Sequence, residues 1–111
     1  RSVYDNEVRC ISYALRYGIK TSFQTWLNLV KSGKRNLRVN RILSLGGGCC
    51  FEIPVLLHFL HPSCREIDIC VLDIHAESWK LFESLHQQYA ELLGVELTFS
   101  YLSRIEGIKE K

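Results

Sequence analysis

Short apolar runs alternate with longer amphipathic segments between residues 41 and 102. The runs are "RILSL" (41–45), "IDICVLD" (67–73) and the strictly alternating "VELTFSYL" (95–102). The segments between them, "FEIPVLLHFL" and "HAESWKLFESLHQQYAELL", have the periodicity of helices. This β-α-β-α-β order predicts parallel strands joined by crossover helices, which is one half of a doubly wound sheet.

The strand patterns predict where each strand lies in the sheet. The first two runs are almost continuously apolar, as expected of strands buried on both faces, whereas the third alternates like an edge strand. We therefore expect an α/β fold with a Rossmann-like half sheet in the strand order 3-2-1. The first strand then needs cover on its far side, because an exposed apolar edge invites pairing. Either the remainder of a longer chain or a partner is expected to supply that cover.

Residues 1–40 are predicted to form an N-terminal helical segment with a basic connector. One helix carries Val8, Ile11 and Leu15 on its apolar face and is expected to end at Gly18. A second begins with a capping box at Thr21 and ends at Gly33; its apolar face comprises Phe23, Trp26, Leu27 and Val30. Residues 41–111 are then the first half of a Rossmann-like cofactor-binding domain, truncated from a longer chain.

The connector is rich in cations, but the chain as a whole is not. Its formal net charge is +2 over 111 residues, which does not by itself imply a polyanionic partner. Nucleic acid is a candidate partner through Lys31, Lys34, Arg35 and Arg38. No aromatic residues interleave with these cations to stack on bases, so a solvated connector is the preferred interpretation.

Five cysteines, Cys10, Cys49, Cys50, Cys64 and Cys70, show neither a disulfide framework nor the ligand spacing of a metal site. We expect free thiols, no metal and an intracellular location, cytoplasmic or nuclear. The longest apolar runs fall short of the roughly 18 residues of a membrane span, so no membrane partner is expected.

The glycines at 46–48 follow the first strand, and Asp73 ends the second. Glycine permits a positive φ and lets a ligand approach the backbone, while a carboxylate in this position can accept hydrogen bonds from ribose hydroxyls. A tight corner without a ligand, and a helix N-cap at Asp73, are the alternatives. The dinucleotide pattern G-x-G-x-x-G would need glycine at residue 51, and Phe51 there argues against NAD.

"ILSLGGGCCFEI" followed by "VLDIHAESW" resembles the first two motifs of class I S-adenosylmethionine-dependent methyltransferases. The resemblance covers residues 41–102, the first half of that fold. It implies that Gly46, Gly47 and Gly48 line the methionine and ribose portion of S-adenosylmethionine or S-adenosylhomocysteine. It further implies that Asp73 binds the ribose and Ile74 the adenine face, with the loop around Ser103 near the adenine edge.

Two departures from the family pattern bear on activity. Cys50 occupies the third glycine position, and Ser44 stands where many members carry an acid near the amino end of the cofactor. A catalytically inactive methyltransferase-like scaffold is therefore the second hypothesis, and an NAD-dependent oxidoreductase the third. The resemblance identifies no catalytic residues, and we expect this segment alone not to catalyse transfer.

Side chains outside the glycine turn are expected to have mainly structural duties. Trp79 and Phe82 are assigned to the core. At least one of Tyr13 and Tyr17 is expected to pack in the core. The alternative role for these two tyrosines is an N-terminal lid over the cofactor. The four histidines are placed at the surface or at helix ends: His58, His61, His75 and His86.

Overall fold

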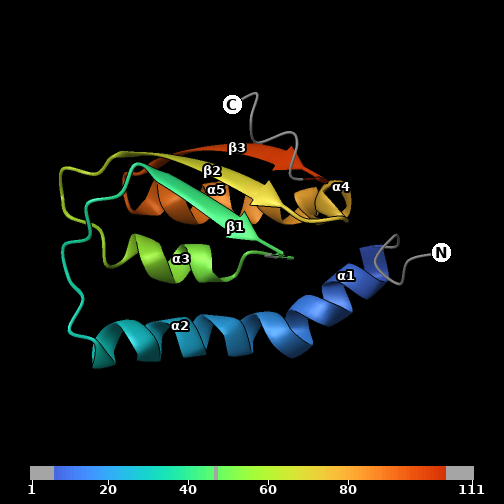
Figure 1. Cartoon of the computed structure of the whole chain (residues 1–111), viewed down its shortest axis with the longest axis horizontal. Helices are drawn as coiled ribbons and strands as arrows, with labels where there is room; N and C mark the ends of the chain where they lie inside the picture. Colours follow the sequence, from blue (N-terminus) through green and yellow to red (C-terminus); the bar gives the residue numbers. More distant parts are fainter. Residues whose placement is uncertain (1–6, 47, 105–111) are drawn as a thin grey trace.

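A computed structural model describes residues 7–46 and 48–104 as a sheet backed by helices (Figure 1). Its three strands, all parallel, are β1 (Arg41–Leu45), β2 (Glu66–Leu72) and β3 (Glu96–Leu102). The segment after β1 contains α3 (Glu52–Leu57), and the one after β2 contains α4 (Ala76–Trp79), η2 (Lys80–Phe82) and α5 (Glu83–Leu92). The β-α-β-α-β prediction is confirmed. The observed order is β1-β2-β3; the predicted list, 3-2-1, counts from the opposite edge.

One face of the sheet carries the main core. Ile67, Ile69 and Val71 of β2 are almost fully buried against α3 and α5. Ile42, Ile69 and Phe99 are paired across the three strands in register, so their side chains share this face. Figure 1 shows both helices on the same side of the sheet. Each buried aliphatic side chain contributes about 1.5–3 kcal/mol relative to exposure.

The other face is open in the described part of the chain. Leu45, Leu72 and Leu102 form a row across it, and Leu45 is 67% exposed. Leu43 of β1 is also half exposed. The expectation that β1 and β2 are buried on both faces is therefore wrong here, because the crossover helices cover only one face. β1 is an edge strand of the sheet, as β3 is.

The N-terminal part forms one continuous helical rod rather than two helices. It consists of α1 (Glu7–Tyr13), the π-helical turn η1 (Ala14–Gly18) and α2 (Ile19–Lys31). Gly18 has helical dihedrals, φ −63° and ψ −45°, so the predicted break there and the capping box at Thr21 are wrong. A Cβ on Gly18 would lie 2.6 Å from the Phe51 ring and 3.1 Å from Cys49 Sγ. This glycine permits close packing instead of ending a helix.

The segment before β3 confirms part of the predicted packing and corrects the rest. Trp79 and Phe82 are buried as expected. Helical periodicity predicts one apolar face that carries Phe82, Leu85, Tyr89 and Leu92, but Leu85 and Leu92 are exposed. The buried positions continue instead through His86 and Ala90, at four-residue intervals from Phe82. His86, assigned to the surface, is 2% exposed. Hydrophobicity alone missed it because a neutral imidazole with a hydrogen bond can occupy a core.

Gly18→Ala should destabilise the protein although alanine is the better helix former. In an open helix the change stabilises by about 1 kcal/mol, but here overpacking against Phe51 should cost about 1–3 kcal/mol. Urea unfolding measures the free energy. Ser12→Ala, at an exposed position of the same rod, is the control and should be neutral or slightly stabilising. Adding Phe51→Leu should recover part of the loss; unchanged or higher stability of Gly18→Ala would contradict the packing role.

Candidate functional site at the strand ends

A cavity of about 340 Å³ lies at the carboxyl ends of the strands, where open α/β sheets bind ligands. Figure 1 shows the three arrowheads at the same end of the sheet. The cavity is lined by Gly46, Leu72, Asp73, Ile74, Ser103 and Arg104. Three predicted cofactor residues, Gly46, Asp73 and Ile74, are thus brought together with the loop after β3. Gly47 lies outside the described residues.

Two glycines of the turn have left-handed backbone conformations. Gly46 has φ +58° and Gly48 φ +57°. The Gly46 amide donates to the Leu72 carbonyl at 2.7 Å, which fixes the turn to the end of β2. A Cβ on Gly46 would meet no atom within 4 Å, so this side of the turn is open to a ligand. Glycine is required here by the dihedral angle and not by crowding.

Cys50, the third position of the pattern, has φ +56° even though it is not glycine. The left-handed conformation costs an L-residue roughly 1–2 kcal/mol. Its side chain is 3% exposed and does not line the cavity; Sγ lies 3.5 Å from Ser44 Oγ. Burial raises the pKa of the Cys50 thiol to about 12 and that of Cys49 to about 11. Both are therefore protonated near neutral pH and lack the thiolate that a nucleophile needs.

Gly48 is not brought into the cavity. A Cβ there would lie 3.5 Å from the Tyr13 ring and 3.6 Å from the Trp79 ring, so α1 and α4 cover this part of the turn. The rings of Tyr13 and Trp79 are 5.2 Å apart between centroids. Tyr13 is thus a packing residue over the turn, while Tyr17 beside it is 42% exposed.

Asp73 links the turn to the start of α4. Its Oδ2 accepts from the Gly48 amide at 3.2 Å, and its Oδ1 accepts from the His75 amide at 2.8 Å. His75, not Asp73, occupies the N-cap position of α4, so the N-cap alternative is wrong. The bond to His75 is instead an Asx turn. A carboxylate has about four lone-pair sites, so two remain for a ligand.

Ser44 and Glu52 form a polar pair that the sequence patterns did not reveal. Ser44 is 6% exposed, and its hydroxyl donates to Glu52 Oε1 at 3.0 Å. Burial, the largest influence, raises the pKa of Glu52 above its usual range. A carboxylate therefore does lie beside position 44, delivered from the first residue of α3. The available signal was an acidic residue eight positions later, in the first turn of the following helix.

His86, on α5, contacts the backbone of the segment that follows the glycines. Its Nε2 lies 2.8 Å from the Cys49 carbonyl oxygen, so this nitrogen carries the proton and donates. Nδ1 is buried and has no hydrogen-bond partner within the described residues. Burial lowers the pKa of His86. The residue is therefore neutral, and it is the side chain that the surface assignment missed.

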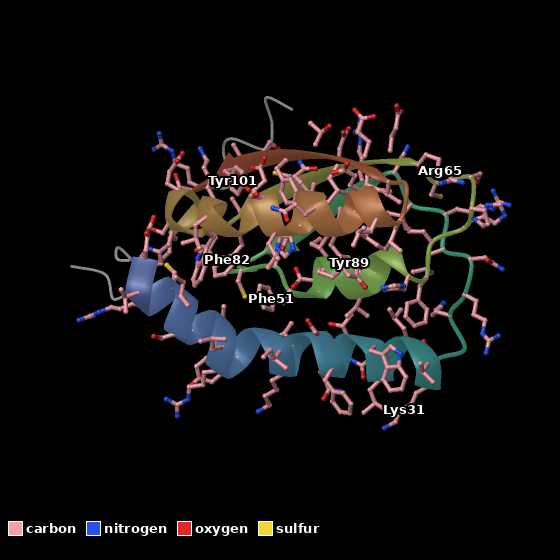
Figure 2. All side chains as sticks on the ribbon, turned by 180° about the vertical axis from the view of Figure 1, so that it is seen from behind. Lys31, Phe51, Arg65, Phe82, Tyr89 and Tyr101 are labelled. Carbon is pink, nitrogen blue, oxygen red and sulfur yellow. The ribbon has the colours of Figure 1, made fainter. Side chains whose placement is uncertain are left out.

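Phe51 points away from the cavity and into the interior. Its ring packs edge-on against Phe82 at 5.5 Å and against His86 at 5.9 Å. Figure 2 shows Phe51 between the N-terminal rod and the layer that contains Phe82. The aromatic ring that departs from the dinucleotide pattern is therefore a core residue and does not contact the cavity.

The basic connector lies at the other end of the sheet. It leads into the amino end of β1, whereas the cavity is at the carboxyl ends. Figure 2 shows Lys31 at the end of the molecule opposite Phe82 and Tyr101. Lys34 and Arg35 line a separate cavity of about 360 Å³, and Arg38 contacts His61 Nε2 at 3.1 Å. The cations thus do not border the candidate site.

Three further properties hold for residues 7–46 and 48–104. These ranges contain no group of three or more His, Cys, Asp or Glu side chains that could hold a metal ion. None of the helices in these ranges is both long and apolar enough to cross a membrane. The five cysteines are free thiols.

Cys50→Gly should be more stable than Cys50→Ala by about 1 kcal/mol, the reverse of the usual order. Both remove the thiol, but only alanine retains the cost of a Cβ at φ +56°. Urea unfolding of both variants measures the difference. The same pair at Cys70, within β2, is the control, and there alanine should be the more stable. An alanine advantage at both positions would show that residue 50 carries no left-handed strain.

The free energy of unfolding should depend on pH through His86. Its folded-state pKa is lowered, so the unfolded chain binds the proton first, near pH 6.5. The stability that neutral His86 contributes is fully present above that pH. As the pH falls below it, the free energy of unfolding decreases by about 1 kcal/mol per pH unit. Urea unfolding at pH 7.5 and 5.0 should show a smaller loss in His86→Gln than in wild type. His61→Gln, at the surface, should keep the wild-type slope; equal slopes in all three would contradict the assignment.

Comparison with known proteins gives no relative for this chain: no family model, curated protein or solved structure matches it. The likeness to methyltransferases therefore rests on the motifs in residues 41–102.

Proposed function

We propose that this chain is the S-adenosylmethionine-binding portion of a class I methyltransferase, built on a Rossmann-like half sheet. The observation that carries the proposal is the cavity at the strand ends. It gathers Gly46, Asp73, Ile74 and the loop at Ser103, which come from three separate segments of the sequence. These are the positions to which the family resemblance assigns cofactor contacts.

The chemistry of the cavity suits an adenosine group. The two unused lone-pair sites of Asp73 can accept the two ribose hydroxyls. Ile74, 78% exposed, offers an apolar surface to one face of the adenine. The Ser103 hydroxyl can pair with the edge of the base. A volume of about 340 Å³ is near the lower end for small-molecule sites and fits a nucleoside better than a dinucleotide.

Glu52 offsets one departure from the family pattern. The resemblance places an acid near the amino end of the cofactor, where this chain has Ser44. The carboxylate of Glu52 is hydrogen-bonded to that serine, on the same turn-and-helix segment. The other departure, Cys50, keeps the backbone dihedral of a glycine and directs its side chain inward. Neither departure therefore blocks the cavity.

Methyl transfer depends chiefly on positioning of the acceptor against the sulfonium carbon. The described residues offer no group assigned to that task. The methyl acceptor stays unknown, and nucleic acid is weakly favoured because of the basic connector. That connector lies at the opposite end of the sheet from the cavity. The edge position of β1 supports the proposal that a further strand, from a longer chain or a partner, pairs with it. The exposed Leu43 and Leu45 lie on the open face and support a further layer there.

A catalytically inactive scaffold is the alternative, and one observation favours it. Tyr13 and Trp79 pack on Gly48, so part of the glycine turn is closed to a ligand. An NAD-dependent oxidoreductase is less favoured. The bulky Phe51 stands where that fingerprint needs its third glycine for close helix packing.

Calorimetric titration with S-adenosylhomocysteine should show binding, and Asp73→Ala should weaken it at least tenfold. Loss of two charge-assisted hydrogen bonds accounts for that magnitude. NAD should not bind. Asp68→Ala is the matched control, an exposed aspartate near the amino end of β2, which Asp73 follows, and should bind as wild type.

Because Asp73 also holds the turn, each variant is first compared with wild type by circular dichroism and thermal unfolding. Asp73→Asn, which retains one acceptor oxygen, should lose less affinity than Asp73→Ala. Equal affinity in wild type and a folded Asp73→Ala would contradict the site. A folded wild-type protein that binds neither ligand would favour the scaffold.

A further inference from the structure

Large apolar side chains line one side of the N-terminal rod and are exposed. They recur at intervals of three or four residues, once per helical turn. We call them the apolar ridge: Ile11, Leu15, Ile19, Phe23, Trp26 and Val30, between 44% and 69% exposed. Sequence periodicity assigned most of these residues to the apolar face of a helix, yet in the described residues they contribute little to the core.

A neighbouring line of small residues packs the rod onto the domain instead. Cys10, Ala14 and Gly18 are buried, and Ser22 donates from its hydroxyl to the Phe51 carbonyl at 2.6 Å. These four residues are also spaced by four positions, and each precedes one of the first four residues of the apolar ridge. One residue corresponds to a rotation of about 100° around a helix. The ridge therefore lies beside the packing line and not beneath it, so the domain does not cover it.

The ridge is large enough to be an interface. From the exposed fractions and the surface of such side chains, it presents on the order of 700 Å². The largest apolar patch of a typical monomer is about 300–600 Å², and a stable interface uses about 800 Å² per partner. Phe23 and Trp26 stack on each other at 6.1 Å, and aromatic residues of this kind often dominate binding.

The charges beside the ridge are almost all positive. Lys20 and Lys31 each follow a ridge residue by one position and so border the same side. Within residues 7–35 the one acidic side chain is Glu7. At the end of the rod, Val30 also lines the 360 Å³ cavity, together with Lys34 and Arg35. The apolar ridge thus continues into a pocket with a cationic rim.

We infer that the apolar ridge binds an amphipathic α-helix of a partner protein whose apolar face is bordered by Asp and Glu. A row of apolar anchors one turn apart matches helix-to-helix packing. A second copy would bring Lys20 and Lys31 against like charges. A lipid surface also fits apolar side chains bordered by cations, and the vesicle measurement below distinguishes it from the acidic helix. This inference is independent of the proposed cofactor.

The test uses two labelled 22-residue helical peptides with leucines at the same spacing, one flanked by glutamates and one by lysines. Fluorescence anisotropy should show at least tenfold tighter binding of the acidic peptide, weakened by salt. Phe23→Ser with Trp26→Ser should reduce that binding at least tenfold. Leu92→Ser, at an apolar residue of α5 that is 82% exposed, is the control and should change it less than twofold.

Reversing the charges tests the acidic partner directly. Lys20→Glu with Lys31→Glu should make the protein prefer the lysine peptide. The altered side chains are exposed, so circular dichroism and thermal unfolding should match wild type, and loss of binding can be assigned to the surface.

Three results would overturn the inference. The first is equal binding of both peptides, or none, by the folded protein. The second is a dimer in sedimentation analysis that Phe23→Ser with Trp26→Ser dissociates, which would make a second copy the occupant. The third is binding to phosphatidylserine vesicles without binding to the acidic peptide.

Discussion

The close approach of three layers at residues 49–51 is the constraint on which the rest of the structure depends. Gly18 lets the N-terminal rod reach the Phe51 ring, and the ring in turn packs on His86 of α5. His86 donates to the Cys49 carbonyl, and Ser22 donates to the carbonyl of Phe51. The rod, the turn after β1 and the helix before β3 are therefore joined through a single short segment. A larger residue at position 18 would push the rod away from residues 49–51.

This arrangement holds both ends of the glycine turn. Its far end is held by core contacts, and its near end by the bond from Gly46 to Leu72. Between them, the Gly48 amide donates to Asp73, whose second oxygen is held by the amide of His75. The carboxylate is thus oriented before any ligand arrives, which lowers the entropic cost of binding. The left-handed backbone at Cys50 persists because the surrounding packing determines it.

Sequence patterns predicted the order of elements and the residues at the strand ends, but not which faces are buried. Parallel strands bring their carboxyl ends together, so Gly46 and Asp73 could be placed at one site from order alone. Burial depends on the neighbouring layer. In the rod, small residues make the close contacts with the domain. Hydrophobic periodicity identifies the large apolar residues instead, so it predicted the wrong buried face. His86 was missed for the related reason that a polar side chain enters the core only when a specific acceptor, here the Cys49 carbonyl, lies within reach.

The two exposed apolar surfaces demand different occupants. The rod packs on α3, which lies on the covered face of the sheet, so the helical layer separates the rod from the open face. At β1 the exposed leucines accompany an edge strand, whose backbone groups are satisfied by another strand. Along the rod the helical backbone is already hydrogen-bonded, so only side-chain packing and charge are available. One partner element cannot meet both requirements. The cations beside the apolar ridge favour an acidic partner there, whereas Arg41 is the one cation within β1.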